Sequence, residues 1–389
     1  MSDKDEFQLP EQGIVFWPVG TGDSTTICVS EEIIMQVDLH HLTAAGEEDD
    51  PHTPIVDRLE ELLPTVDGDP YLAAFVLTHP DQDHCSGFAD LLDRVKIGEL
   101  WFSPRVFREY AADLCDDAKA FRKEAKRRVK ETISQGTAVE SGDRVRVIGY
   151  DELLKEDDYE GFPDERLTVP GNAVTQLDDV ECDGTFRAFV HAPFKDDSAG
   201  ERNEASIALQ VSLTSEDVQG RLLLLGDLSY PTIRRIFDES EADDVAWDVM
   251  LSAHHCSKSV MYWKGPNESS ESRKQDILDD MEAAAGSPGC IIASSEPVPS
   301  SNEPGDNPPH AKAKSRYQEI APGGFFCTQE YPSEDDPEPM VFEPGPAEFS
   351  LSDAKGTRAA AGLTVSEAVT RARGTSEPPK ERVGFGRHD

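Results

Sequence analysis

The segment 79–84 reads HPDQDH, so that His79, Asp81, Asp83 and His84 stand within six residues. It follows a short apolar run and precedes apolar residues at helical spacing, which predicts a turn between a buried strand and a helix. Burying so many nitrogen and oxygen ligands is costly unless a cation neutralises them. Zinc and manganese accept such a mixture of imidazole and carboxylate. The alternative is a polar loop whose aspartates cap the helix; the density of ligands favours a metal site.

Aspartate or histidine also stands at or just beyond the end of three other predicted strands. Asp38 follows the strand predicted at 32–37, Asp227 follows the apolar run 222–225, and His254 and His255 follow the strand predicted at 245–251. Alone, each would be a turn or a polar corner. Open α/β sheets gather their sites at the carboxyl ends of strands, so the recurrence predicts that these side chains meet.

The elements that must position these residues are short strands alternating with helices, which indicates an α/β fold. A hairpin is expected across 214–220. Further strands are predicted at 13–19, 24–29, 186–190, 207–213, 290–293 and 324–328, and helices at 55–63, 88–95, 109–134, 230–237 and 310–319.

The composition is strongly acidic. Asp and Glu number 77 against 37 Lys and Arg, for a formal net charge of −40, and the acid is spread along the chain. Such a surface suits a salty, halophile-like cytoplasm and repels nucleic acid except at a local basic patch. Seven scattered cysteines without a CxxC pair fit reduced thiols. We expect a cytoplasmic protein without a signal peptide or a membrane segment.

One segment, 118–130 (AKAFRKEAKRRVK), is basic, with seven cationic residues and one glutamate. On a helix, Arg122, Lys126 and Lys130 share one face, as do Lys123 and Arg127. The run predicts either a phosphate-binding ridge or a solvated helix face, and both interpretations stay open.

The residues 1–332 are expected to form one domain with a helical basic insertion at about 105–135. From 333 to 389 the chain is acidic and rich in proline with few core residues, which predicts a largely disordered tail. Such a tail leaves room for a protein partner.

The motifs together resemble the metallo-β-lactamase fold hydrolases. The pattern THPDQDH at 78–84, Gly226-Asp227 after a strand and a later strand ending in histidine are similar to that superfamily. Asp81 in place of the usual second histidine resembles the hydrolase domain of ComEC-type DNA-uptake proteins. Further marks of that branch are GDS at 22–24, NEAS at 203–206 and HHCSK at 254–258. The likeness spans about 13–329 and implies an αββα sandwich, two mixed sheets flanked by helices.

The resemblance implies a centre with two divalent metal ions. His79 and Asp81 would hold one ion, Asp83 and His84 would hold the second, and Asp227 would bridge the two. Asp83 or Asp227 would take a proton from the attacking water.

Other positions follow from the same resemblance. One of His254 and His255 would complete the ligand set, and Asp38 would orient a ligand from behind. Asn203 lies where most members place another metal-binding histidine, so one metal would be held loosely.

The chain departs from the branch at Cys85 and Cys256, the latter standing where the branch has glycine. Cys256 would ligate zinc or make the site oxidation-sensitive, or it would simply be a buried small residue. Ser257, Lys258 and His310 are candidate substrate contacts, with Arg122, Lys126 and Arg127 of the basic run as others.

Three functions are compatible with these residues. The first is a metal-dependent phosphodiesterase or nuclease acting on nucleic acid. The second is a hydrolase of small esters, such as phosphocholine esters or lactones, for which the basic helix is irrelevant. The third is an effector or scaffold subunit of a DNA-related or defence system, which the intact ligand set disfavours.

Overall fold

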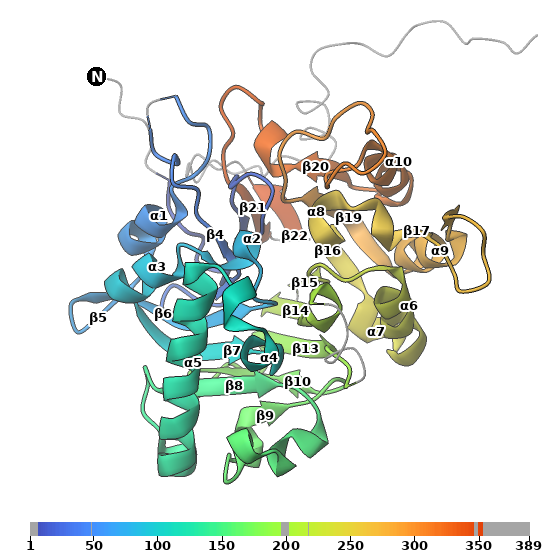
Figure 1. Ribbon diagram of the computed structural model, residues 1–389. Helices are drawn as coiled ribbons and strands as arrows, with labels where there is room; N and C mark the ends of the chain where they lie inside the picture. Colours follow the sequence, from blue (N-terminus) through green and yellow to red (C-terminus); the bar gives the residue numbers. More distant parts are fainter. Residues whose placement is uncertain (1–6, 48, 196–201, 217, 346–348, 353–389) are drawn as a thin grey trace, which may run out of the picture.

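The computed structural model describes residues 7–47, 49–195, 202–216, 218–345 and 349–352. Two mixed β-sheets pack face to face, and helices cover both outer faces (Figure 1). The predicted αββα sandwich is therefore confirmed. No helix in the described ranges combines the length and apolarity needed to cross a membrane.

The first sheet has the order β22-β21-β1-β2-β3-β6-β7-β8-β9, with β5 attached to β6. Its strands from β22 to β3 pair in antiparallel fashion, and those from β3 to β9 are parallel. Its strands are β1 Gly13–Phe16, β2 Thr25–Cys28, β3 Ile34–Val37, β5 Thr65–Val66, β6 Asp69–Leu77, β7 Lys96–Phe102, β8 Arg144–Ile148, β9 Leu167–Thr168, β21 Met340–Pro344 and β22 Phe349–Ser352.

The second sheet repeats this plan in the order β10-β13-β14-β15-β16-β19-β20. Its first four strands are antiparallel and its last four are parallel, β15 belonging to both sets. The predicted hairpin is β14–β15. The strands are β10 Ala173–Val174, β13 Phe186–Ala192, β14 Ala208–Ser215, β15 Val218–Leu224, β16 Trp247–Leu251, β19 Ala285–Ala293 and β20 Gly324–Cys327.

Three hydrophobic clusters hold the layers together. One lies between the sheets, and the other two lie between each sheet and its helices. The first sheet is covered by α1 Ile55–Leu62, α3 Phe88–Arg94 and α5 Asp116–Gln135, and the second by α6 Tyr230–Glu239, α9 Gln275–Ala284 and α10 Ala311–Ile320. The shorter helices are α2 Gln82–Cys85, α4 Arg105–Arg108, α7 Ala242–Val245 and α8 Ala253–Cys256.

Helix α5 contains the basic run, and an apolar stripe attaches it to the first sheet. Phe121, Ala125 and Val129 recur at helical spacing and are buried, as the core face of an amphipathic helix requires. The helix begins at Asp116, later than the predicted 109, because Cys115 has extended backbone angles and caps it by accepting a hydrogen bond from the Ala118 amide.

The expected boundary at 332 is wrong, because the first sheet includes two later strands. Strand β21 pairs with β1, and β22 pairs with β21. Met340, Phe342, Phe349 and Leu351 alternate along the two strands into the cluster between the sheets, and Val341 is buried on the other face, so β21 is buried on both faces and β22 on one. The acidic and proline-rich composition concealed this alternation. The remainder of the predicted tail, 353–389, lies outside the described residues.

Candidate metal centre

The predicted ligands meet at one edge of the sandwich, because several strands end there. His79 follows β6, Asp227 follows β15, and His254 and His255 lie in α8 after β16. Strand β2 runs antiparallel to β3, so Asp23, which precedes β2, reaches the same edge as residues that follow β3.

Asp227 stands at the centre of the cluster. Its side chain is 3% exposed, and its two oxygens face different partners. Oδ1 lies 3.2 Å from His84 Nε2 and 3.6 Å from His255 Nε2. Oδ2 lies 3.7 Å from His79 Nε2 and 3.4 Å from His254 Nε2. The carboxylate is therefore placed to bridge two groups of ligands.

Each side of Asp227 carries two imidazoles and one further carboxylate. Asp83 Oδ2 lies 3.4 Å from His255 Nε2, and we call Asp83, His84 and His255 the His84 group. Asp81 Oδ2 lies 3.5 Å from His79 Nε2. The His79 group accordingly consists of His79, Asp81 and His254.

The polar atoms at the centre make no hydrogen bond. Nε2 of His79, His84 and His255, and Oδ1 of Asp227, are buried without a hydrogen-bonding partner. Buried polar groups are normally satisfied, and an orphaned one costs about 1–3 kcal/mol. Nitrogen and oxygen atoms that converge in this way fit divalent cations such as zinc or manganese. The chemistry of the donors therefore suits a divalent metal.

Buried carboxylates stand behind both histidines of the His84 group. Asp38 Oδ2 lies 2.8 Å from His84 Nδ1, and Asp38 also accepts hydrogen bonds from the amide and the hydroxyl of Thr78. Because His84 Nδ1–H donates to Asp38, its Nε2 atom is the one that faces Asp227. Asp38 therefore has the orienting position predicted for it.

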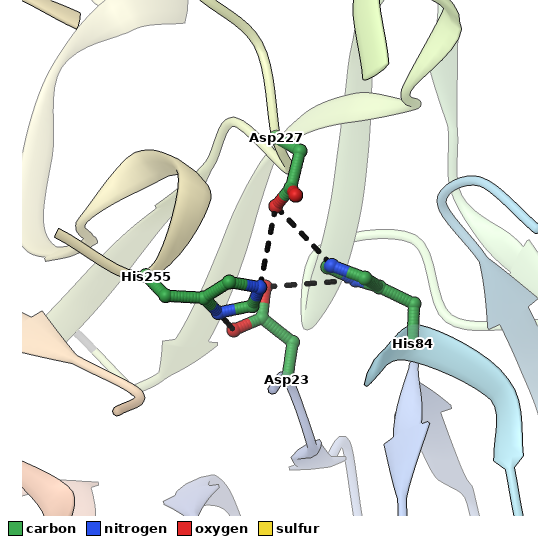
Figure 2. A group of neighbouring side chains, drawn as sticks. All are labelled: Asp23, His84, Asp227 and His255. Atoms are coloured by element: carbon green, nitrogen blue, oxygen red, sulfur yellow. Dashed lines mark ion pairs between the residues drawn. The ribbon is translucent and has the colours of Figure 1, made fainter. Parts of the chain in front are cut away.

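Asp23 has the equivalent position behind His255, with its Oδ1 3.2 Å from His255 Nδ1 (Figure 2). Asp23, His84, Asp227 and His255 offer ligand atoms within 4.8 Å of one another. Asp23, however, faces the Nδ1 atoms, whereas Asp227 faces the Nε2 atoms. We therefore assign Asp23 an orienting role.

These charges shift the pKa values of the group. Burial opposes protonation of His84 and His255, but neighbouring carboxylates outweigh it and raise both pKa values, that of His255 to about 10. Burial would raise the pKa values of Asp83 and Asp227, but the imidazoles lower both. Without a cation, the His84 group therefore holds protons on its imidazoles.

The His79 group has different support. His79 Nδ1 lies 3.2 Å from the hydroxyls of Thr78 and Ser206. The Thr78 hydroxyl donates to Asp38 and the Ser206 hydroxyl donates to the Asn203 carbonyl, so both oxygens are free to accept from His79 Nδ1–H. His79 Nε2 therefore also faces the centre as a lone pair, but a neutral hydroxyl replaces the carboxylate.

Asp81 is held by a cation from outside the group. Arg202 donates a hydrogen bond to Asp81 Oδ1, and its other terminal nitrogen lies 3.3 Å from Glu109 Oε2. Burial would raise the pKa of Asp81, but His79 and Arg202 together lower it. Arg202 thus leaves Asp81 Oδ2 as the oxygen directed at His79.

Helix α8 brings both predicted histidines to the centre through a left-handed turn. His254, His255 and Cys256 have φ angles of 50°, 51° and 66°, which non-glycine residues rarely adopt and which cost about 1–3 kcal/mol each. The turn directs the two rings to opposite oxygens of Asp227. The sequence left open which histidine completes the set; the structure places both there.

The remaining predicted residues lie around this turn. Asn203 contributes its backbone carbonyl, through Ser206. Ser257 is buried and bonds to Ser259, and Lys258 Nζ lies 3.6 Å from Glu271. His310 bonds the amide of Lys258 and the carbonyl of Asp306. The structure does not bring these side chains into the cluster, so their contact with substrate stays a prediction.

Part of the basic run is neutralised within the protein. Arg127 bonds Glu124 and Asp143, Arg128 bonds Glu124, and Arg122 donates to two backbone carbonyls. Its exposed cations without an ion pair in the described structure are Lys123, Lys126 and Lys130.

No protein-family model and no curated protein matches the sequence. Among solved structures, a subclass B3 metallo-β-lactamase from a soil metagenome library aligns with 64% of this chain and 80% of its own, at 11% identity and TM-score 0.30. BJP-1 of Bradyrhizobium japonicum aligns with 64% and 78%, at 13% identity and TM-score 0.30. A B3 enzyme with an active-site glutamic acid aligns with 72% and 88%, at 14% identity and TM-score 0.33.

The strand order and the helical layers define the architecture as an αββα sandwich of two mixed sheets. At one edge of this sandwich lies a buried His/Asp cluster whose donor atoms suit a divalent metal.

Proposed function

We propose that the protein is a two-metal hydrolase that cleaves phosphodiesters, and that its substrate is nucleic acid. We also propose that it groups with the hydrolase domains of ComEC-type proteins, a branch of the metallo-β-lactamase fold hydrolases. The observation that carries the proposal is Asp227, whose Oδ1 faces the buried, unsatisfied Nε2 atoms of His84 and His255, while its Oδ2 faces that of His79. Two-metal sites of this kind serve hydrolytic displacement at phosphorus.

The two ligand groups would each hold one cation, shared through Asp227. Zinc or manganese there would supply Lewis-acid activation of water and of the ester. Asp227 is buried between the two groups, so it fixes their positions relative to each other. Asp83 is 38% exposed and stands at the solvent side, so it is the better placed of the two to hydrogen-bond the attacking water and accept its proton.

The substrate proposal rests on helix α5. Its first turn is docked against the start of α3, shortly after the segment 79–84 that we call the metal loop, where the Asp117 carboxylate accepts from the amides of Gly87 and Ala89. Lys126 and Lys130, together with Phe107 and Asp158, line a cavity of about 140 Å³. Cations beside an aromatic ring are suited to the phosphates and bases of a single strand.

Two other functions remain as alternatives. A small ester would need only the cluster and would be indifferent to the lysines of α5. An effector subunit of a DNA-related or defence system would need a protein partner, and we propose that the acidic tail would bind it.

The seven cysteines are all free thiols, which supports the proposal of a reducing cell interior as the site of action.

An activity panel tests the hydrolase proposal. The metal-loaded protein and Asp83→Ala are assayed with single- and double-stranded DNA, RNA and small phosphodiesters, using zinc, manganese and magnesium in turn. We expect wild-type cleavage and a loss of about 10²–10³-fold in the variant. A wild-type protein that contains no metal after zinc loading would support the effector alternative.

Charge reversal tests the substrate. We expect Lys126→Glu with Lys130→Glu to weaken nucleic-acid cleavage several-fold and to reduce its salt dependence, while leaving a small chromogenic diester unaffected. Lys96→Glu is the control, since Lys96 is exposed and begins β7, far along the strand from the site edge. Equal cleavage of nucleic acid by all three proteins favours a small ester.

A further inference from the structure

Two thiols face each other beside the metal loop. Cys85 Sγ lies 3.6 Å from Cys115 Sγ. Cys85 is the last residue of α2 and follows His84 directly, whereas Cys115 is the N-cap of α5. A disulfide needs a sulfur separation of about 2.05 Å, so a shift of about 1.5 Å would join the two elements.

The two cysteines have different environments. Cys85 is fully buried, and its thiol lies 3.1 Å from the Asp81 carbonyl. Cys115 is partly exposed, and its sulfur accepts from the Ala118 amide at the start of a helix of 20 residues. An accessible sulfur with a protected neighbour is the arrangement of an attacking and a resolving cysteine.

We propose that Cys85 and Cys115 form a redox-active dithiol site that takes hydroperoxides as its oxidant. The contact with Cys85 lowers the pKa of Cys115 to about 6, against the effect of burial, which together with its exposure makes Cys115 the better nucleophile of the two.

The reaction balances with these two residues and one hydroperoxide. The Cys115 thiolate attacks the peroxide, an S–O bond forms, the O–O bond breaks and the leaving oxygen departs as water or alcohol. The Cys85 sulfur then attacks the sulfenic acid, so that an S–S bond forms and water leaves with the thiol proton. Two thiols are oxidised and one peroxide is reduced, and a dithiol reductant reverses the change.

Oxidation acts on α2 because Cys85 is its last residue. The disulfide pulls α2, which carries Asp83 and His84, towards α5. The oxidised protein therefore holds metal in the His84 group more weakly. This consequence rests on the proposed metal centre, whereas formation of the disulfide does not.

The first experiment needs no metal. The reduced full-length chain is treated with hydrogen peroxide, and its thiols are counted after denaturation. We expect seven thiols to fall to five, with a peptide linking Cys85 to Cys115 in the mass spectrum. Cys115→Ser keeps a good helix cap and should retain all six of its thiols, while the control Cys182→Ser should lose two. A wild type that keeps seven, or links another pair, overturns the proposal.

The second experiment measures zinc retained against a chromogenic chelator. We expect oxidised wild type to lose zinc at least about tenfold more readily than the reduced protein, the size of effect seen when ligands lose their support. Cys115→Ser should be insensitive to the oxidant. Equal retention by both wild-type forms overturns the effect on the centre. A protein that binds no zinc in either form contradicts the metal centre itself and leaves the disulfide result standing.

Discussion

The two sides of Asp227 have similar ligands but different surroundings. In the His84 group, His84 and His255 are buried and each has a carboxylate behind its Nδ1 atom. In the His79 group, His79 is backed by hydroxyls, His254 is 27% exposed, and Asp81 is shared with Arg202. Because a carboxylate behind a ligating imidazole raises its basicity, we infer that the His84 group binds metal more tightly.

Removing Asp227 should erase the difference between the groups. In Asp227→Asn the shared negative charge is lost, so we expect both metals to dissociate on dialysis and activity to fall about 10³-fold. Metal per chain, measured by elemental analysis, checks this result. Asp243→Asn, an exposed substitution, serves as the control; one metal retained in Asp227→Asn would contradict the bridging role.

Removing the backing carboxylates should weaken the His84 group more than the His79 group, which Asp38 reaches only through the Thr78 hydroxyl. We expect Asp38→Asn to weaken metal binding in the His84 group by about 10–100-fold, and Asp23→Asn to act in the same direction but less, since its contact is longer. Chelator competition should resolve one strongly weakened ion and one that changes much less. Equal weakening of both ions would show that the two groups are not independent.

Proton release should also distinguish the groups. The pKa of His255 is raised to about 10 and that of His84 is also raised, whereas burial lowers the pKa of His254 despite Asp227. A ligating imidazole must lose its proton. At pH 8 we therefore expect filling of the His84 group to release up to about two protons, whereas His254 should release none on binding metal. Calorimetry in two buffers of different ionisation enthalpy measures both numbers.

The smallest effect should come from Arg202. This cation helps to lower the pKa of Asp81, so Arg202→Gln should raise that pKa. Metal bound to Asp81 should then be released at a higher pH on acidification, by a few tenths of a pH unit for a contact that is partly exposed. Arg202→Lys is the matched variant and should lie between the two. A shift to lower pH would contradict the assigned role.

Most of the centre could be predicted because its residues follow strands. A strand end fixes where a side chain emerges, and the run 79–84, Asp227 and the two histidines all carry that signal. Asp23 was missed as a site residue because it precedes its strand, and only the antiparallel pairing of β2 with β3 brings it to the edge. Arg202 has no local signal, since its contacts with Asp81 and Glu109 join distant segments.

Charge patterns were less informative than strand ends. The sequence showed seven cations between 118 and 130, but not which of them are neutralised. Arg127 and Arg128 share Glu124, while Arg122 is bound to backbone carbonyls that no spacing predicts. Within this run, the cations available to a phosphate in the described structure are therefore Lys123, Lys126 and Lys130.

The pairing of β1 with β21 has a consequence for how the chain is made. Ile14 lies opposite Phe342, so one neighbour of β1 leaves the ribosome long after β1 itself. Until then, the outer edge of β1 exposes unpaired backbone groups, which favour association with other chains. Contacts of such long sequence separation also slow folding. Newly made chains truncated before residue 340 should therefore aggregate, although every proposed metal ligand is already present.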